Sequence, residues 1–288
     1  MKILFFDCSA GISGDMTLGA LLHLGADIDR LREELGKLEI TGYALNPNKW
    51  QKNGITGVNL DVVIQGEDEP ARETVPAHEH AHGGADHSHD GNHPHDHGHA
   101  HVHPHTHEPG HAHTDAPASS AETGNRPPAS EDAHRSFKAI RALIENSALK
   151  DIVKKMAIDI FAVIAKAEAA VHDMPVEDVV FHEVGAVDSI VDIVGTAVCV
   201  DLLGAEAVYC SPVHDGRGFI RCRHGMIPVP VPAVMEMLKG SDISVVSEDV
   251  DTEMVTPTGM GILRGLGAKC AHMPEINVLG VGYGFGKR

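Results

Sequence analysis

The sequence predicts an α+β fold in which helices and short β-sheets form mixed layers, interrupted by a disordered, histidine-rich insertion. Three observations support this fold class. Strand-like runs occur near both ends of the chain, and long patterns with helical spacing lie between them. The two kinds of element also do not alternate in the regular order of a doubly wound parallel sheet.

The N-terminal part, residues 1–66, predicts the order β-α-α-β-β. The patterns are an apolar run over 2–6, helical spacing of apolar residues over 15–27 and 27–38, and alternation over 43–64. The alternating segment contains the turn Asn53-Gly54, which predicts two strands joined by a tight connection.

Residues 67–133 differ from the rest of the chain in composition. They contain thirteen acidic and two basic residues and almost no Leu, Ile or Phe. Such a segment cannot bury enough apolar surface to offset the entropy lost on ordering. We therefore predict a disordered acidic insertion between two folded parts.

The C-terminal part, residues 134–288, predicts a second set of helices and strands, which we expect to share a core with residues 1–66. Helical patterns cover 134–147, 148–173, 189–204, 232–240 and 256–267, and strand-like runs cover 207–213, 218–222, 242–248 and 276–284. In the longest helix, one apolar face is expected to hold Ile152, Met156, Ile160, Val163 and Ala167.

Composition excludes several classes of partner. The net charge is −18 and aromatic residues make up only 4% of the chain, so neither nucleic acid nor an anionic membrane is an expected partner. No apolar run reaches the ~18 residues of a membrane span. The five scattered cysteines contain no CxxC pair, and Asp7 interrupts the short apolar start, so we expect free thiols and a cytoplasmic protein.

The insertion is rich in metal-ligand side chains. Residues 78–113 hold fifteen of the chain's twenty-two histidines. Every second residue is a histidine in one run: His95, His97, His99, His101, His103, His105 and His107. Neutral imidazole suits Ni²⁺, Zn²⁺, Cu²⁺ and Co²⁺, so this segment is expected to supply many weak, exchangeable sites. The alternative is a polar linker that binds metal only incidentally.

The segment "FDCSAGISGDMT" reads as a strand, a turn and the start of a helix. Its turn, with Ser13 and Gly14, would present backbone N–H groups to an anion. Asp7 and Asp15 are instead candidates for holding a hard cation. The alternative is that Asp15 only caps the helix and Cys8 only fills core space.

The segment "FHEVGAVDSIVDIVG" concentrates ionisable residues. His182, Glu183, Asp188 and Asp192 are candidate catalytic residues. On a helix, Asp188 and Asp192 would be neighbours one turn apart among apolar residues, so each carboxylate needs a partner. A capping role for Asp188 is the alternative.

Two further segments are candidate anion sites. "VHDGRGFIRCRHG" supplies Arg217, Arg221 and His224, whose side chains suit a phosphate or a carboxylate. "DTEMVTPTGMG" supplies Thr256 and Thr258 at the start of a helix. A capped helix with no ligand is the alternative for the second segment.

Five segments, in chain order, resemble one family. The segments are "FFDCSAGISGDMTLGALLHLGA", the His-rich insertion, "FHEVGAVDSIVDIVG", "HGMIPVPVPAVMEMLKG" and "DTEMVTPTGMGIL". Together they resemble the nickel insertion proteins of the lactate racemase cofactor pathway. The resemblance implies CTP-dependent insertion of Ni²⁺ into pyridinium-3,5-bisthiocarboxylic acid mononucleotide, a lyase reaction assisted by Mg²⁺ or Mn²⁺. The product is a cofactor with nickel bound to carbon and sulfur.

Members of that family continue beyond the "GVGYGFG" region into a C-terminal domain associated with CTP binding, whereas this chain stops at Arg288. The chain therefore resembles an N-terminal, nickel-handling half, which would need a separate C-terminal half as partner, and a homo-oligomer is expected. Two other readings remain open: a nickel store or chaperone without catalysis, and a metal-dependent nucleotide hydrolase.

Overall fold

The computed structural model describes residues 1–64, 136–181, 184, 186–222 and 224–286. The expected insertion over 67–133, with its alternating histidines, lies outside the described residues, as do His182 and Glu183. The described residues 1–64 and 136–286 belong to one compact unit.

The fold class predicted from the sequence, α+β, is confirmed. The N-terminal part contains β1 (Ile3–Phe6), α1 (Gly14–Leu24), α2 (Ile28–Gly36), β2 (Tyr43–Lys52) and β3 (Ile55–Ile64), in the predicted order. The helices of the C-terminal part are α4 (Phe137–Asn146), α5 (Asp151–His172), the 3₁₀ turn η1 (Val176–Asp178), α6 (Val187–Leu203), α7 (Pro232–Leu238) and α8 (Pro257–Gly265). Its strands are β4 (Ala207–Cys210), β5 (Val213–Asp215), β6 (Phe219–Cys222), β7 (Gly225–Pro228), β8 (Val245–Ser247) and β9 (Lys269–Cys270).

Small sheets join segments that are far apart in the chain. β1 pairs in parallel with β4, from Ile3 opposite Ala207 to Phe6 opposite Cys210, and β4 pairs in parallel with β9. β5 and β8 form a second parallel pair. β2 with β3, and β6 with β7, form antiparallel hairpins.

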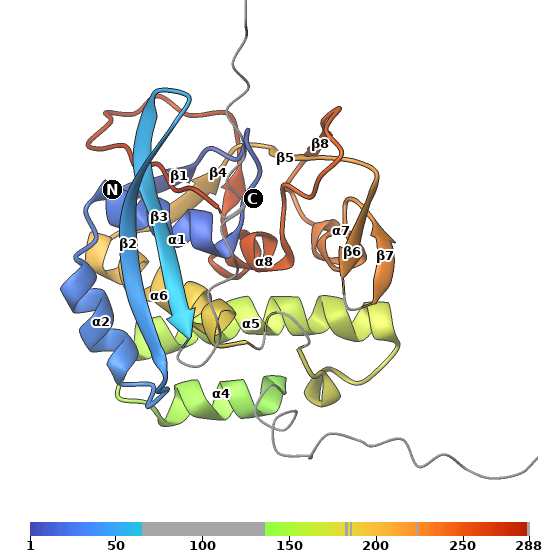
Figure 1. The fold of residues 1–288 in the computed structure, drawn as a ribbon, viewed down its shortest axis with the longest axis horizontal. Helices are drawn as coiled ribbons and strands as arrows, with labels where there is room; N and C mark the ends of the chain where they lie inside the picture. Colours follow the sequence, from blue (N-terminus) through green and yellow to red (C-terminus); the bar gives the residue numbers. More distant parts are fainter. Residues whose placement is uncertain (65–135, 182–183, 185, 223, 287–288) are drawn as a thin grey trace, which may run out of the picture. The chain divides into compact units, whose positions relative to one another are not determined.

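The helices provide most of the core. α5 contacts α4, α6, α7 and α8 (Figure 1), and α6 contacts α1 and α2. The β2–β3 hairpin packs against α1 through β3 (Figure 1). α8 approaches α5 closely because it has glycine at the contact: a Cβ on Gly265 would lie 2.4 Å from the Cα of Ile160.

Two expectations about the C-terminal part were wrong. Of the five residues predicted on one apolar face, Ile160 and Ala167 are buried and Met156 and Val163 half-buried, but Ile152 is 51% exposed. Val153 and Ala157, outside the predicted face, are buried as well. The reason is that several helices contact α5, and its buried surface is wider than the single stripe assumed from the sequence.

The run over 276–284 does not form a strand of a sheet. It makes one isolated bridge with β3, through hydrogen bonds that join Val58 to Tyr283 and Phe285 at 2.9 and 3.0 Å. This segment lies directly over α1, since a Cβ on Gly284 would be 1.8 Å from the carbonyl oxygen of Met16. It also lies against Gly57 of β3, where an added Cβ would be 2.5 Å from the carbonyl oxygen of Tyr283, so the segment packs on both α1 and β3 with a single backbone bridge.

None of the described helices combines the length and the apolar character needed to cross a membrane.

Candidate functional site

The start of α1 lies at the centre of the candidate site. Ser13 caps the helix, and its hydroxyl oxygen accepts a hydrogen bond from the backbone N–H of Met16 at 3.4 Å. Asp15 accepts from the same N–H at 2.9 Å and from the Ser13 hydroxyl. A carboxylate in the first turn is favourable beside the positive end of the helix dipole. Ser13 is thus the N-cap of α1, and Asp15 supports the cap from the first turn.

Other residues of the first segment have local contacts. Asp7 is exposed and accepts a hydrogen bond from the backbone of Ser9 at 3.1 Å. Cys8 is 1% exposed and belongs to the core, which matches the alternative that it fills core space. Burial raises the pKa of the Cys8 thiol, so it stays protonated at neutral pH.

The start of α1 is joined to the start of α8 by backbone hydrogen bonds. The N–H of Ile12 donates to the carbonyl of Met254 at 2.8 Å, and the N–H of Thr256 donates to the carbonyl of Ile12 at 3.0 Å. The Thr256 hydroxyl caps α8 by accepting from the N–H of Gly259 at 3.1 Å. The N-terminal ends of α1 and α8 therefore lie side by side.

A glycine brings α6 into the same place. A Cβ on Gly14 would lie 2.6 Å from the Oδ2 atom of Asp192 and 2.8 Å from the Cγ2 atom of Thr258. Only a residue without a side chain allows α1 to approach α6 and α8 this closely. We call the meeting point of Gly14, Asp192 and Thr258 the three-helix junction. It brings together three motifs that are separate in the sequence.

Asp188 lies one turn before Asp192, as predicted. It is in the first turn of α6, half-buried, and its carboxylate accepts from the backbone N–H of Ser189 at 2.8 Å. Asp192 is also half-buried and lies at the three-helix junction. The two carboxylates are thus on the same helix, and Asp192 is the one that lies against α1.

Asp215 is a residue that the sequence analysis did not single out. It is fully buried, and its Oδ1 atom accepts three backbone hydrogen bonds, from Gly216, Met254 and Val255, at 2.9, 2.8 and 3.1 Å. Two of these bonds hold the segment that leads into α8. The sequence signal for Asp215 was an Asp-Gly pair directly after a strand-like run. In such a pair the Asp carboxylate typically accepts a hydrogen bond from a backbone N–H of the following turn.

A pocket lies beside the three-helix junction. Its volume is about 270 Å³, and its walls come from α5, the residues before α6, the β6–β7 hairpin and the starts of α7 and α8. Most of the lining is apolar. The polar lining residues are Glu168, His172, Cys222, His224 and Glu253. Pro257, the first residue of α8, connects this pocket to the junction.

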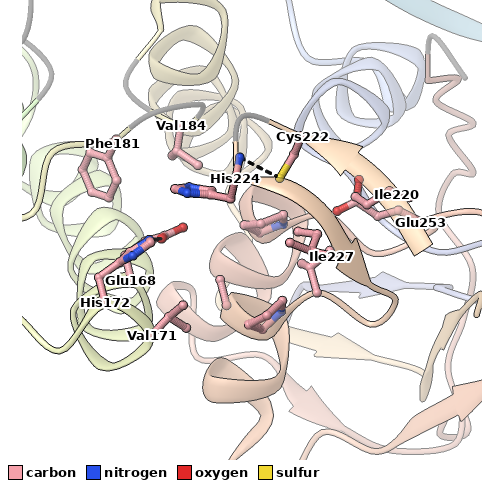
Figure 2. A pocket seen from close by; sticks show the side chains of 14 residues that line it. Glu168, Val171, His172, Phe181, Val184, Ile220, Cys222, His224, Ile227 and Glu253 are labelled. Carbon is pink, nitrogen blue, oxygen red and sulfur yellow. Dashed lines mark hydrogen bonds and ion pairs between the residues drawn. The ribbon is translucent and has the colours of Figure 1, made fainter. Parts of the chain in front are cut away.

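Two sides of the pocket carry metal-ligand side chains. Glu168 and His172 extend from α5, with 3.4 Å between the Oε2 and Nε2 atoms, and the His172 side chain is 31% exposed. The His172 and His224 rings are neighbours, with centroids 4.9 Å apart and ring planes tilted by 40° (Figure 2). The Cys222 sulfur, from the same hairpin as His224, accepts a hydrogen bond from the His224 backbone N–H at 3.4 Å.

The sequence analysis found His224 but missed Glu168 and His172. The available signal was a Glu-x-x-x-His pair near the end of a long apolar helix, since residues four apart share a helix face. Within the described ranges, no three His, Cys, Asp or Glu residues are already arranged to hold a metal ion.

The two arginines predicted to bind one anion are not brought together at the pocket. Arg217 is exposed and pairs with Asp249 and Asp251 on the surface, with 3.7 Å between its Nε atom and Asp251. Arg221 is exposed on β6, between Ile220 and Cys222, which both line the pocket. Because successive residues of a strand point to opposite faces, Arg221 points away from the pocket.

Comparison with known proteins identifies the family. The model of the nickel insertion protein family matches residues 4–288. The chain belongs to the nickel insertion protein family. The resemblance noted from five sequence segments is thereby confirmed, and no solved structure matches the chain.

Individual members of the nickel insertion family match the chain from end to end. It is 42% identical to the pyridinium-3,5-bisthiocarboxylic acid mononucleotide nickel insertion protein of Acetivibrio thermocellus, covering 100% of this chain and 57% of that protein. The protein of the same name from Lactiplantibacillus plantarum is also 42% identical, with 100% and 59% covered. That of Geobacillus kaustophilus is 37% identical, with 100% and 56% covered. The chain thus spans less than two thirds of the length of these relatives.

Proposed function

We propose that this chain is the nickel-handling part of a protein that inserts Ni²⁺ into pyridinium-3,5-bisthiocarboxylic acid mononucleotide, forming the nickel-pincer cofactor of lactate racemase. The observation that carries the proposal is the three-helix junction. There a carboxylate, Asp192, meets two helix N-terminal ends beside a pocket lined by two histidines and a cysteine. Relatives that match the whole chain are named for insertion of nickel into the same mononucleotide, which supports the same substrate.

The reaction needs a group that accepts a proton. When a nickel–carbon bond forms on the pyridinium ring, the C–H bond breaks, its electron pair binds the metal and the proton leaves. Asp192, with Asp188 one turn away, is placed to accept that proton or to hold a cation. His182 and Glu183, outside the described residues, remain candidates for the same roles.

The substrate is an anion, with a phosphate and two thiocarboxylates. The N-terminal ends of α1 and α8 provide backbone N–H groups and favourable helix dipoles, with Ser13, Gly14, Thr256 and Thr258 at the contact. His224 would add a donor from the pocket wall. Arg217 and Arg221, on exposed surface, would act on the substrate or on a partner only from outside the pocket.

We further propose that the reaction is that of a CTP-dependent lyase assisted by Mg²⁺ or Mn²⁺. Mg²⁺ usually takes one or two protein carboxylates and completes its shell with water and phosphate oxygens. Asp188 and Asp192 supply that number of carboxylates on one helix. CTP would bind to a C-terminal half supplied as a partner.

The five cysteines are free thiols, which supports a cytoplasmic, reducing location. Assembly as a homo-oligomer is part of the same proposal.

Reconstitution tests the function. The chain would be incubated with the mononucleotide, Ni²⁺, Mg²⁺ and CTP, alone and with the C-terminal region of a relative as a separate polypeptide. We expect nickelated product, detected by mass spectrometry, only when both polypeptides are present. Absence of product with both halves, under conditions in which a full-length relative is active, would reject the proposal.

A nickel store or chaperone is the second candidate, favoured by the fifteen histidines of residues 78–113. Replacing those histidines with asparagine distinguishes the two. A store would lose its function entirely, whereas an insertion protein supplied with excess Ni²⁺ would keep its turnover. CTP hydrolysis in the absence of the mononucleotide would instead indicate a nucleotide hydrolase.

A further inference from the structure

The segment over 272–281, which follows β9, presents apolar side chains to solvent, and every residue in it is exposed. Five of the exposed side chains are apolar: Met273 (55%), Ile276 (36%), Val278 (62%), Leu279 (83%) and Val281 (57%). A continuous apolar surface of this kind usually marks a contact with another protein surface. Figure 1 shows the segment in red, on the side of the molecule that holds α1 and the β2–β3 hairpin. We call residues 272–281 the apolar segment.

The chain directly after the apolar segment is fixed to the fold. Glycine lets its backbone lie on α1, since a Cβ on Gly282 would be 2.1 Å from the carbonyl oxygen of Ala20. The side-chain amide of Asn59, which is fully buried, donates to the carbonyl of Phe285 at 2.8 Å. The apolar segment is therefore presented from an anchored base. Anchoring of this kind lowers the conformational entropy that is lost when a partner binds.

The exposed apolar surface continues onto the β2–β3 hairpin. Tyr283 is 45% exposed, and its backbone packs on Gly57 of β3. Trp50 is opposite Gly57 in the register of the hairpin, so the two residues share one face of it, and Trp50 is 42% exposed. Large aromatic side chains are typical anchors of protein–protein contacts. We call the apolar segment together with Trp50 and Tyr283 the apolar face.

The chain after the apolar face runs to the start of α1. A Cβ on Gly286 would be 3.6 Å from the Oδ2 atom of Asp15, in the first turn of that helix. Asp15 is the neighbour of Gly14, which belongs to the three-helix junction. Each further residue of a chain adds at most about 3.5 Å. A polypeptide that continues from this point therefore begins close to the junction.

We propose that the apolar face is the surface on which the C-terminal half of a nickel insertion protein docks. The inference rests on the proposed function, which assigns CTP to that half. Docked there, the half that carries CTP would lie next to the start of α1, beside the three-helix junction.

Two observations favour this occupant over a second copy of the chain. The apolar face adjoins the point from which a C-terminal half would continue, so in a longer member of the family docking is intramolecular and gains from a high effective concentration. Relatives that match the whole chain are also much longer than it is, since the chain covers 57% and 59% of two of them. They therefore have enough additional polypeptide to cover the face.

Cysteine labelling tests the docking surface in two proteins. One is the 288-residue chain, and the other is a fusion in which the C-terminal region of the Acetivibrio thermocellus relative follows Arg288. Leu279→Cys is introduced into both, and its alkylation by iodoacetamide is followed by mass spectrometry, peptide by peptide. We expect alkylation at this position to be at least about tenfold slower in the fusion, because a docked surface excludes solvent and reagent.

Ile152→Cys is the matched control, because Ile152 is also an exposed apolar residue, at 51%, but lies on α5. Its alkylation should proceed at the same rate in the two proteins. Equal rates at position 279 in the two proteins, or equal slowing at both positions, would overturn the proposal. Slow alkylation at position 279 in the chain alone, with a rate that falls as protein concentration rises, would show that a second copy covers the face and would overturn it as well.

A second measurement needs no substitution. Amide hydrogen exchange over 272–281 should be at least about tenfold slower in the fusion than in the chain, whereas α4 should exchange equally in both. Unchanged exchange over 272–281 would contradict docking on this face. Docking and nickelation are separate readouts. A fusion that protects the apolar face but gives no nickelated product rejects the proposed function alone, and product without protection rejects the docking surface alone.

Discussion

Asp192 is the residue whose position most directly links the fold to the proposed chemistry. It lies on a mostly buried helix, and its carboxylate oxygen would be 2.6 Å from a Cβ added to Gly14. Partial burial of a charge costs folding free energy unless a partner compensates it, so such a residue usually has a structural or a functional role. The role can be structural, through a paired charge, or functional, through a bound cation or substrate.

Asp192→Asn separates these possibilities because it removes the charge with little change in volume. If the residue is functional, we expect near-normal or higher thermal stability and loss of nickelation in the reconstituted system. Asp201→Asn is the control, since Asp201 lies on the same helix and pairs with the exposed Lys150 at 2.6 Å. It should cost no more than about 1 kcal/mol and leave nickelation intact. A clear drop in melting temperature for Asp192→Asn, with activity retained, would assign Asp192 to the core.

Asp215 is expected to act through structure alone. Its Oδ1 atom satisfies three backbone N–H groups, two of them in the segment that leads into α8. Asp215→Ala leaves those buried donors without an acceptor, so we expect a loss of about 3–5 kcal/mol in the free energy of unfolding, measured with denaturant. Asp215→Asn keeps an acceptor oxygen and should lose clearly less. Equal losses in the two variants would mean that the charge, and not the hydrogen bonding, stabilises this loop.

Among the elements, α1, α6 and α8 depend on glycine for their close approach. We expect Gly14→Ala to cost about 1–3 kcal/mol, because the added carbon must displace Asp192 or Thr258. The variant should also weaken nickelation, since the junction would open. Gly36→Ala is the control: Gly36 is in α2, is exposed, and has no atom within 4 Å of an added Cβ. It should be neutral or stabilising by up to about 1 kcal/mol. Similar unfolding curves for the two variants would contradict the predicted close contact.

The histidine-rich segment is expected to bind several Ni²⁺ ions weakly and to release them as pH falls. Imidazole ligates only when neutral, and its unperturbed pKa is about 6.5. Affinity should therefore be present at pH 7.5 and largely lost at pH 5.5, which calorimetric titration at the two pH values would measure. One tight site, or binding that does not change with pH, would contradict a reservoir of exchangeable sites.

At the scale of the whole molecule, the N-terminal and C-terminal parts are held together by contacts across the chain. β1 pairs with β4, α1 packs on α6 and α8, and α2 packs on α6. The composition of residues 67–133 predicts ready cleavage by proteases. We expect limited proteolysis to give two bands on a denaturing gel that still elute as one complex from a sizing column. Fragments that separate without denaturant would show two independent domains.

The sequence by itself determined the fold class, the order of most elements and the family. Apolar spacing is a local property, so helices such as α4, α6 and α8 could be predicted from it. Apolar spacing predicted the buried residues less well on α5, where Ile152 is exposed and the helices packed on several sides bury a wider surface than one stripe. The segment over 276–284 alternates like a strand, yet it packs against α1 and makes one isolated bridge to β3.

The site was predictable in part, residue by residue. Asp188 and Asp192 were expected one turn apart on a helix, and they are. Only the tertiary structure shows that Asp192 lies against Gly14 and Thr258. Local sequence patterns do not predict which helix ends will be in contact. In the sequence, Glu168 and His172 look like any polar residues of an amphipathic helix. Only the packing of the folded chain places them in one pocket with Cys222 and His224. The physical reason is common to these cases: sequence spacing fixes which side chains share a face, whereas the burial of those faces against distant segments fixes which faces touch.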